Sequence, residues 1–252
     1  MGQLIKILTA SAWLLLGLVL AAQSASAQKR YPAIEDAWDG TDYRAVIERV
    51  RKDGLELPTL ADAATKPVFE RMVNTDNIPL RMGLNKQMPV TIRFQKLDSA
   101  LDPVHKLVVL YSEETKKGKP YAAELARMMV YESKISAAML NLTEPLISSL
   151  DKDSRYQSRL DELQKLKDGA RQLYADLVQR MTETRVHSKS DILKMVGSAL
   201  DELPAYQPVF TSQDRQGLTQ KLTQQISATT DGELKKAMTE LRDAIEHSRV
   251  RT

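Results

Sequence analysis

A single carboxylate, Glu132, lies within the apolar stripe of a long predicted helix. The apolar positions of that stripe, read at helical spacing, are Leu125, Met128, Met129, Ile135, Met139 and Leu142. A carboxylate there could serve as a general acid or base, bind a metal, or form half of a structural ion pair. Because an unpaired buried charge is costly, we expect Glu132 to meet a cation from another helix or to face a gap.

The pair Glu132-Ser133 resembles the Glu-Ser pair of lytic transglycosylases, in which a helical glutamate acts as acid and base on peptidoglycan. The resemblance covers these two residues. The glycine-rich segment that follows in that family and the aromatic residues of a sugar cleft are missing. A two-carboxylate glycosidase also needs a second acid in the same cleft. We therefore favour a structural ion pair or hydrogen-bond anchor, and we keep Glu132 as a catalytic candidate in the alternative.

The three histidines, His105, His187 and His247, are isolated in the sequence. None has a second histidine at the spacing of helical zinc ligands, so each is interpreted as a surface or loop histidine. The nucleophile and phosphate-binding motifs GxSxG, SxxK, GxxxxGK[ST] and GxGxxG are also absent from the chain. We expect no cofactor and no metal, and a non-enzymatic role is favoured over an enzymatic one.

The segment 151–162 has carboxylates at positions 1, 3 and 12 of a calcium loop, namely Asp151, Asp153 and Glu162. Arg155 at position 5 cannot bind calcium, and Tyr156 stands where the sharp turn requires glycine. The acidic residues instead fit the start of a helix, where the macrodipole favours negative charge.

The first 27 residues have the three parts of a secretory signal peptide. Lys6 precedes an apolar run, and Ala25-Ser26-Ala27 is a small-x-small cleavage site. An uncleaved anchor is the alternative, but the run is short for a bilayer span. We expect removal of residues 1–27, a mature chain of residues 28–252, and a periplasmic or secreted bacterial protein without a transmembrane span.

The composition excludes further kinds of chemistry and argues against one class of partner. The chain has no cysteine, which excludes thiol catalysis and disulfides. Its formal net charge is +3, and basic and acidic residues are interspersed. This mixture is typical of a solvated surface and does not indicate a nucleic-acid partner.

The periodic segments are nearly all helical and predict an all-α fold, an irregular helical bundle in one domain of residues 28–252. Seven of the ten prolines fall within residues 32–120, which predicts short, proline-broken helices in this half and longer helices afterwards. The stretch 116–120, KKGKP, is a possible domain boundary or an exposed loop. Segments 212–228 and 232–248 predict a C-terminal helical hairpin.

Three prolines predict helix boundaries. Asp102-Pro103 is a start signal, with an N-cap residue followed by proline in the first turn. Pro145 is expected to kink or end the helix that carries Glu132, and Pro204 to stop the helix that opens at Ser190 or Asp191.

Together these features favour an exported, non-enzymatic helical scaffold that binds a protein or an envelope component. The first alternative is a glycan hydrolase or lyase that acts on peptidoglycan with Glu132 as general acid/base. A carrier of a small molecule or lipid, with an apolar cavity between helices, is the second alternative.

Overall fold

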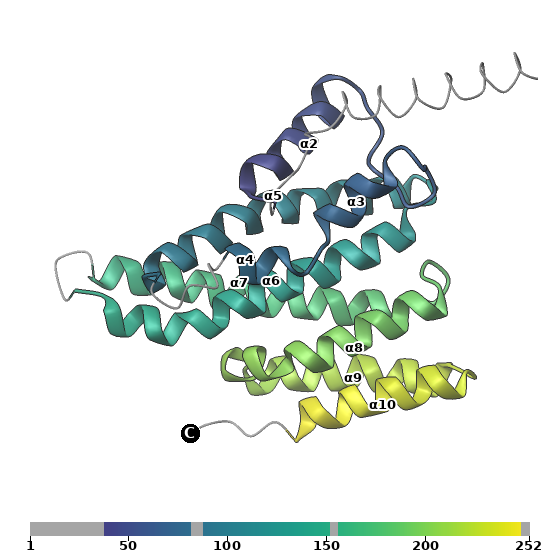
Figure 1. Ribbon diagram of the computed structural model, residues 1–252. Helices are drawn as coiled ribbons and strands as arrows, with labels where there is room; N and C mark the ends of the chain where they lie inside the picture. The colour runs from purple at the N-terminus through teal and green to yellow at the C-terminus, as the bar shows by residue number, and fades with distance from the viewer. Residues whose placement is uncertain (1–37, 82–87, 152–155, 248–252) are drawn as a thin grey trace, which may run out of the picture.

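The computed structural model describes residues 38–81, 88–151 and 156–247. Every regular element in these ranges is helical, so the all-α bundle is confirmed (Figure 1). The helices are α2 (Gly40–Lys52), α3 (Lys66–Met72), α4 (Asn77–Arg81), α5 (Val90–Lys116), α6 (Ala122–Ser149), α7 (Tyr156–Met181), α8 (Lys189–Tyr206), α9 (Ser212–Ala228) and α10 (Gly232–Glu246). Within these ranges, no helix combines the length and the hydropathy that crossing a membrane requires.

Helix α6 is the centre of the bundle. It packs against α5, α7 and α8, while α9 and α10 form the far layer at the bottom of Figure 1. The KKGKP stretch forms the turn between α5 and α6, and Gly118 there has a φ of 87°, which glycine adopts without strain. The turn makes α5 and α6 antiparallel neighbours along most of their length.

Helix α5 does not begin at Asp102, as the sequence predicted, but at Val90, and Pro103 lies in its interior. Because Pro103 has no N–H, the Ser99 carbonyl four residues earlier loses its usual intrahelical donor. The backbone of Gly40 in α2 lies so close to this carbonyl that a Cβ at position 40 would overlap its oxygen. The Ser99 carbonyl, which lacks its intrahelical donor, thus lies where a second helix approaches closely.

Pro145 and Pro204, the other two prolines expected to mark helix boundaries, also lie inside helices. Helix α6 continues past Pro145 to Ser149, and α8 continues past Pro204 to Tyr206, so the predicted stop at Pro204 was wrong. Helix α8 is opened by Ser188, whose hydroxyl accepts a hydrogen bond from the Asp191 N–H.

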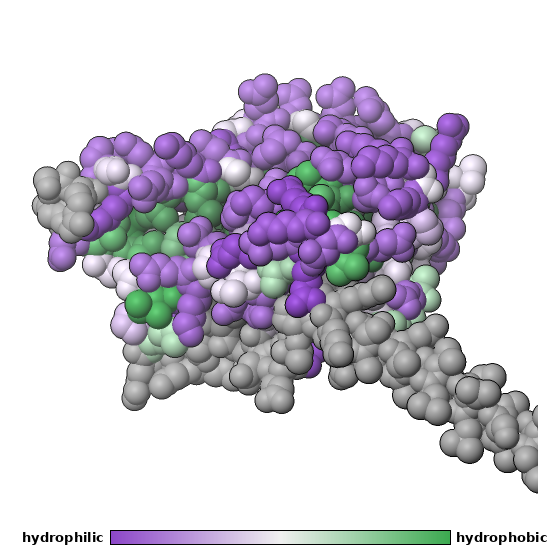
Figure 2. All heavy atoms as spheres, turned by 90° about the horizontal axis from the view of Figure 1, so that it is seen from above, coloured by the Kyte–Doolittle hydropathy of each residue, from purple (hydrophilic) through white to green (hydrophobic). Residues whose placement is uncertain are grey.

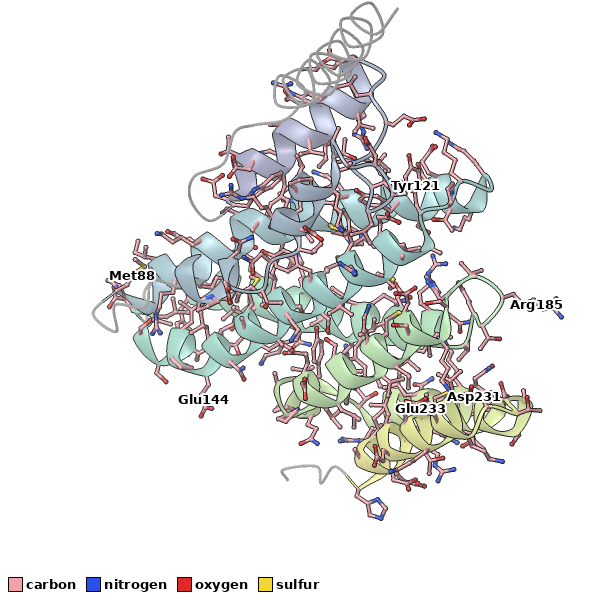
Figure 3. All side chains as sticks on the ribbon, turned by 45° about the vertical axis from the view of Figure 1, so that its right-hand side comes forward. Met88, Tyr121, Glu144, Arg185, Asp231 and Glu233 are labelled. Carbon is pink, nitrogen blue, oxygen red and sulfur yellow. The ribbon has the colours of Figure 1, made fainter. Side chains whose placement is uncertain are left out.

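The predicted C-terminal hairpin of α9 and α10 is confirmed. Asp231 caps α10 by accepting hydrogen bonds from the backbone N–H groups of Glu233 and Leu234. Lys189 at the start of α8 lies 2.9 Å from Asp231 and 2.8 Å from Glu233, and both acids lie at this end of α10 (Figure 3). These contacts join the hairpin to the rest of the bundle.

Candidate functional site

Glu132 lies on the buried face of α6, as the apolar stripe predicted. Its side chain is 3% exposed. The apolar neighbours on its stripe are also buried; they include Leu125, Met128, Met129, Ile135 and Met139. The carboxylate therefore depends on a nearby polar group to offset the loss of water.

The partner of Glu132 is His105 on α5. The imidazole Nδ1 lies 2.7 Å from Glu132 Oε1, and the His105 side chain is 62% exposed. The predicted cation from another helix is thus a histidine, in the middle of α5 and not in a first turn. One member of the pair is in water and the other is in the core.

Each member of the pair changes the pKa of the other. Burial raises the pKa of Glu132, and the hydrogen bond from His105 opposes that rise. The same hydrogen bond raises the pKa of His105, although partial burial acts in the other direction. The contact thus favours a proton shared between the two side chains, and its strength depends on their protonation.

The pair lines a cavity of about 440 Å³ between α5, α6 and α7. Its apolar wall includes Leu101, Val108, Met129, Leu166 and Leu173, and its polar wall includes Asp98, Asp102 and Asp176. Among the described residues, no group of three or more histidine or acidic side chains is arranged to hold a metal ion. The cavity thus combines an aliphatic interior with acidic edges.

A second cavity, of about 630 Å³, continues from the first between the same three helices, α5, α6 and α7. Both cavities are lined by Asp98 and Leu166, and the second also includes Phe94, Arg159 and Glu162. We call the combined space the α5/α7 groove. Hydrophobic surface also gathers between hydrophilic side chains at the left-hand end of the molecule, where α6 leads to α7 (Figure 2).

Burial and neighbouring acids raise the pKa of Asp98 in this groove. Its carboxyl group is partly buried, and the negative charges of Asp102 and Glu162 add to the effect. Asp102 forms an ion pair with Lys106 at 2.6 Å on the exposed face of α5. The groove therefore concentrates negative charge in a chain whose formal net charge is +3.

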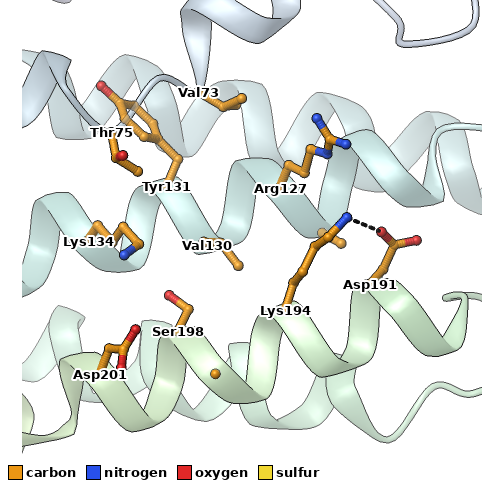
Figure 4. A pocket seen from close by; sticks show the side chains of 12 residues that line it. Val73, Thr75, Arg127, Val130, Tyr131, Lys134, Asp191, Lys194, Ser198 and Asp201 are labelled. Carbon is orange, nitrogen blue, oxygen red and sulfur yellow. Dashed lines mark ion pairs between the residues drawn. The ribbon is translucent and has the colours of Figure 1, made fainter.

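A separate cavity of about 440 Å³ lies between α6 and α8 (Figure 4). Its charged lining is mixed. Lys134 lies 3.3 Å from Glu202, and Lys194 lies 4.0 Å from Asp191, the pair marked in Figure 4. Since both signs of charge occur along it, this cavity has a weaker electrostatic preference than the α5/α7 groove.

Glu124 is a buried carboxylate that the sequence analysis missed. It is 2% exposed. Its Oε1 accepts hydrogen bonds from the Thr59 hydroxyl at 2.8 Å and the Leu60 N–H at 2.6 Å, while no partner for Oε2 exists among the described residues. Glu124 thus ties the segment between α2 and α3 to α6.

The other two histidines lie outside the groove. His187 lies in the connection between α7 and α8, as a loop histidine would, but it is buried there, and its Nδ1 lies 3.1 Å from the Ala122 carbonyl. His247 is exposed at the end of α10. Asp153 and Arg155 of the calcium-loop comparison lie outside the described residues, while Tyr156 begins α7.

The pairing of His105 with Glu132 has a signal in the sequence. His105 precedes Gly118 by 13 residues and Glu132 follows it by 14, as the numbering gives. Two helices joined by a tight turn at Gly118 place such equidistant residues at the same height. The equal spacing indicates a contact only if the helix before the turn is continuous from residue 90, and Pro103 indicated a break there.

Comparisons of the chain with protein-family models, with curated proteins and with solved structures find no match.

Proposed function

We propose that the chain is an exported, non-enzymatic helical protein that binds a partner protein or a component of the cell envelope. The observation that carries the proposal is the α5/α7 groove, which combines apolar side chains with a row of acidic ones. Well-formed apolar cavities with a few polar groups are typical binding sites. The groove supplies a surface for recognition.

The state of Glu132 supports binding over catalysis. Its Oε1 is engaged by His105, and its side chain is almost fully enclosed. A general acid must reach the substrate atom to which it gives its proton, directly or through one water. Glu132 is instead positioned to hold His105 at the wall of the groove.

Site-specific photo-crosslinking tests this proposal in cells that produce the protein. A photoreactive residue replaces Gly169, which lines the groove, and the control replaces Gly217 on α9. A side chain at either position begins in open space, because no atom lies within 4 Å of an added Cβ. We expect a discrete crosslinked envelope component from position 169 and none from position 217. Equal crosslinking from both positions, or none from either, contradicts the proposal.

Export is a separate part of the proposal and rests on the leader sequence. Mass spectrometry of the protein from the periplasmic or secreted fraction measures its N-terminus. We expect a chain that begins at Gln28, after removal of residues 1–27. A cytoplasmic protein that retains Met1 would contradict this part.

The alternative is a hydrolase or lyase acting on peptidoglycan. The raised pKa of Glu132 and the acids at Asp98, Asp102 and Asp176 in the same cavity are the observations that favour it. Its test is the release of soluble glycan fragments from purified peptidoglycan by the parent protein and by Glu132→Gln. Release by the parent alone would establish the alternative, and release by neither would support the binding role.

A further inference from the structure

Helices α5 and α7 lie on either side of the α5/α7 groove. Both pack against α6, but they make few close contacts with each other. At one end they are linked where Arg180 of α7 donates a hydrogen bond to the Ser112 hydroxyl of α5 at 2.7 Å. Since Asp98 of α5 and Glu162 of α7 line the other part of the groove, the two helices run parallel.

The groove lining follows the repeat of a helix that packs along another helix. On α5, Phe94, Leu101 and Val108 are spaced by seven residues. Leu166 and Leu173 have the same spacing on α7. Phe94, Leu101 and Leu166 remain partly exposed at the edge of the core. Seven-residue spacing on two neighbouring parallel helices is the pattern that accepts the side chains of a further helix.

The polar lining has the same repeat. Glu162, Gly169 and Asp176 are seven residues apart on α7, as are Asp98 and His105 on α5. A helix lying in the groove would therefore meet aliphatic side chains at its centre and carboxylates at its edges. Gly169 adds room, because the position of its missing Cβ has no atom within 4 Å.

The charge of the lining selects the partner's charge. The side chains that line the groove and can carry positive charge are Arg159 and His105. Six acids line it: Asp98, Asp102, Glu132, Asp151, Glu162 and Asp176. Opposite charges across an interface favour the correct partner and speed association. A basic partner fits this groove better than an acidic or neutral one.

We infer that the α5/α7 groove binds an amphipathic, basic α-helix of a partner protein. Its apolar residues would recur every three or four positions, with Lys or Arg on both flanks. The lining on α5 extends from Thr91 to Val108, a length of about 27 Å that matches five helical turns. The inference rests on the proposed binding function and names the partner's chemistry.

The first test uses a synthetic 18-residue peptide as probe. The peptide carries Leu at heptad positions and Lys at the flanking positions, and its binding to the purified protein is measured by fluorescence anisotropy. A scrambled peptide of the same composition controls for non-specific attraction of cations, and a version with Glu in place of Lys controls for charge. We expect binding of the first peptide, at least tenfold weaker binding of the scrambled peptide, and no binding of the acidic one.

Variants of the protein locate the site. Gly169→Leu fills the groove, and Gly197→Leu fills the α6/α8 cavity of Figure 4 as its matched control. Both positions have open space at Cβ, and leucine favours a helix more than glycine does. We expect Gly169→Leu to weaken binding at least tenfold and Gly197→Leu to leave it unchanged. The double variant Asp98→Asn/Asp176→Asn leaves the shape intact, and we expect it to weaken binding severalfold and to reduce its salt dependence.

Other outcomes overturn the inference. Equal binding of the scrambled peptide means attraction of cations without helix recognition. Displacement of the peptide by dodecylamine at matched concentration identifies a small amphipathic amine as the occupant, and loss of binding in Gly197→Leu alone moves the site to the other cavity. Concentration-dependent dimerisation that Gly169→Leu abolishes identifies a second copy of the chain. A crosslinked envelope component at position 169 with no peptide binding would leave the proposed function standing and reject only the helical, basic partner.

Discussion

His105 Nδ1 lies 2.7 Å from Glu132 Oε1, so an exposed imidazole covers a carboxylate that is almost fully buried. The two residues have unequal roles because water reaches the exposed His105 side chain but hardly reaches Glu132. Without Glu132, His105 can still be hydrated. Without His105, the carboxylate of Glu132 must find a proton or remain as a poorly solvated charge.

The contact between Gly40 and the Ser99 carbonyl predicts a stability effect. Gly40→Ala places a methyl group on that oxygen, so α2 must shift away from α5. We expect a loss of about 1–3 kcal/mol in the free energy of unfolding, the usual cost of overpacking. Urea denaturation measures it. Gly217→Ala, where the added Cβ meets open space, is the control and should gain about 0.5–1 kcal/mol from helix propensity. A neutral Gly40→Ala would contradict the close packing.

The burial of His187 predicts a lower free energy of unfolding in acid. Burial lowers the pKa of His187 below its usual 6.5, so the unfolded chain takes up a proton that the folded chain refuses. Stability is therefore lost as pH falls below about 6.5, by up to about 1.4 kcal/mol per pH unit. We expect His187→Gln to flatten this slope below about pH 6.5. Thermal unfolding across that range measures the slopes, and an unchanged slope in His187→Gln would reject this origin.

Glu124 predicts local loosening of the N-terminal segment. Glu124→Ala removes the acceptor of the Thr59 hydroxyl and the Leu60 N–H. We expect a loss of about 2 kcal/mol, since hydrogen bonds to a charged acceptor are the stronger kind. Limited proteolysis should then cut first between α2 and α3. Glu144→Ala, at an exposed position of the same helix (Figure 3), should leave both stability and the cleavage pattern unchanged. Equal protection of the segment in both variants would contradict the anchoring role.

The helical class and the C-terminal hairpin could be predicted because local patterns determine them. Apolar residues at helical spacing define α9 and α10, and Asp231 with Gly232 marks the start of the second. The burial of Glu132 followed from the same kind of pattern. These features need no knowledge of which helices are neighbours.

The proline boundaries could not be predicted because tertiary contacts decide them. Pro103 has the local signature of a helix start, and the Gly40 backbone beside the Ser99 carbonyl comes from a distant part of the chain. Placing the helix start at Asp102 also hid the partner of Glu132, since His105 then lay in a first turn. The α5/α7 groove was beyond reach for the same reason, because it depends on two helices sharing α6 as a common neighbour.

The most direct test of the account is a double-mutant cycle on His105 and Glu132 at pH 7. The free energy of unfolding is measured by urea denaturation for the parent, His105→Ala, Glu132→Gln and the double variant. His105→Ala should lose about 2 kcal/mol, less than a fully buried pair because His105 is largely exposed. Glu132→Gln, which keeps a hydrogen-bonding group without a buried charge, should stay within about 1 kcal/mol of the parent.

The pH dependence of the cycle has a defined sign. The raised pKa of His105 gives a stabilising contribution that is present in acid and is lost as pH rises through the folded pKa of His105, above 6.5. The raised pKa of Glu132 has a separate effect, because ionising the buried carboxyl costs stability as pH rises above 4.5. In acid, Glu132 takes up a proton in the His105→Ala variant, so the loss of unfolding free energy in that variant should become smaller. At pH 7 the double variant should be as stable as Glu132→Gln, because a neutral side chain at position 132 no longer requires His105 as a partner. Equal, additive losses from the two single substitutions would contradict the pairing of an exposed imidazole with a buried carboxylate.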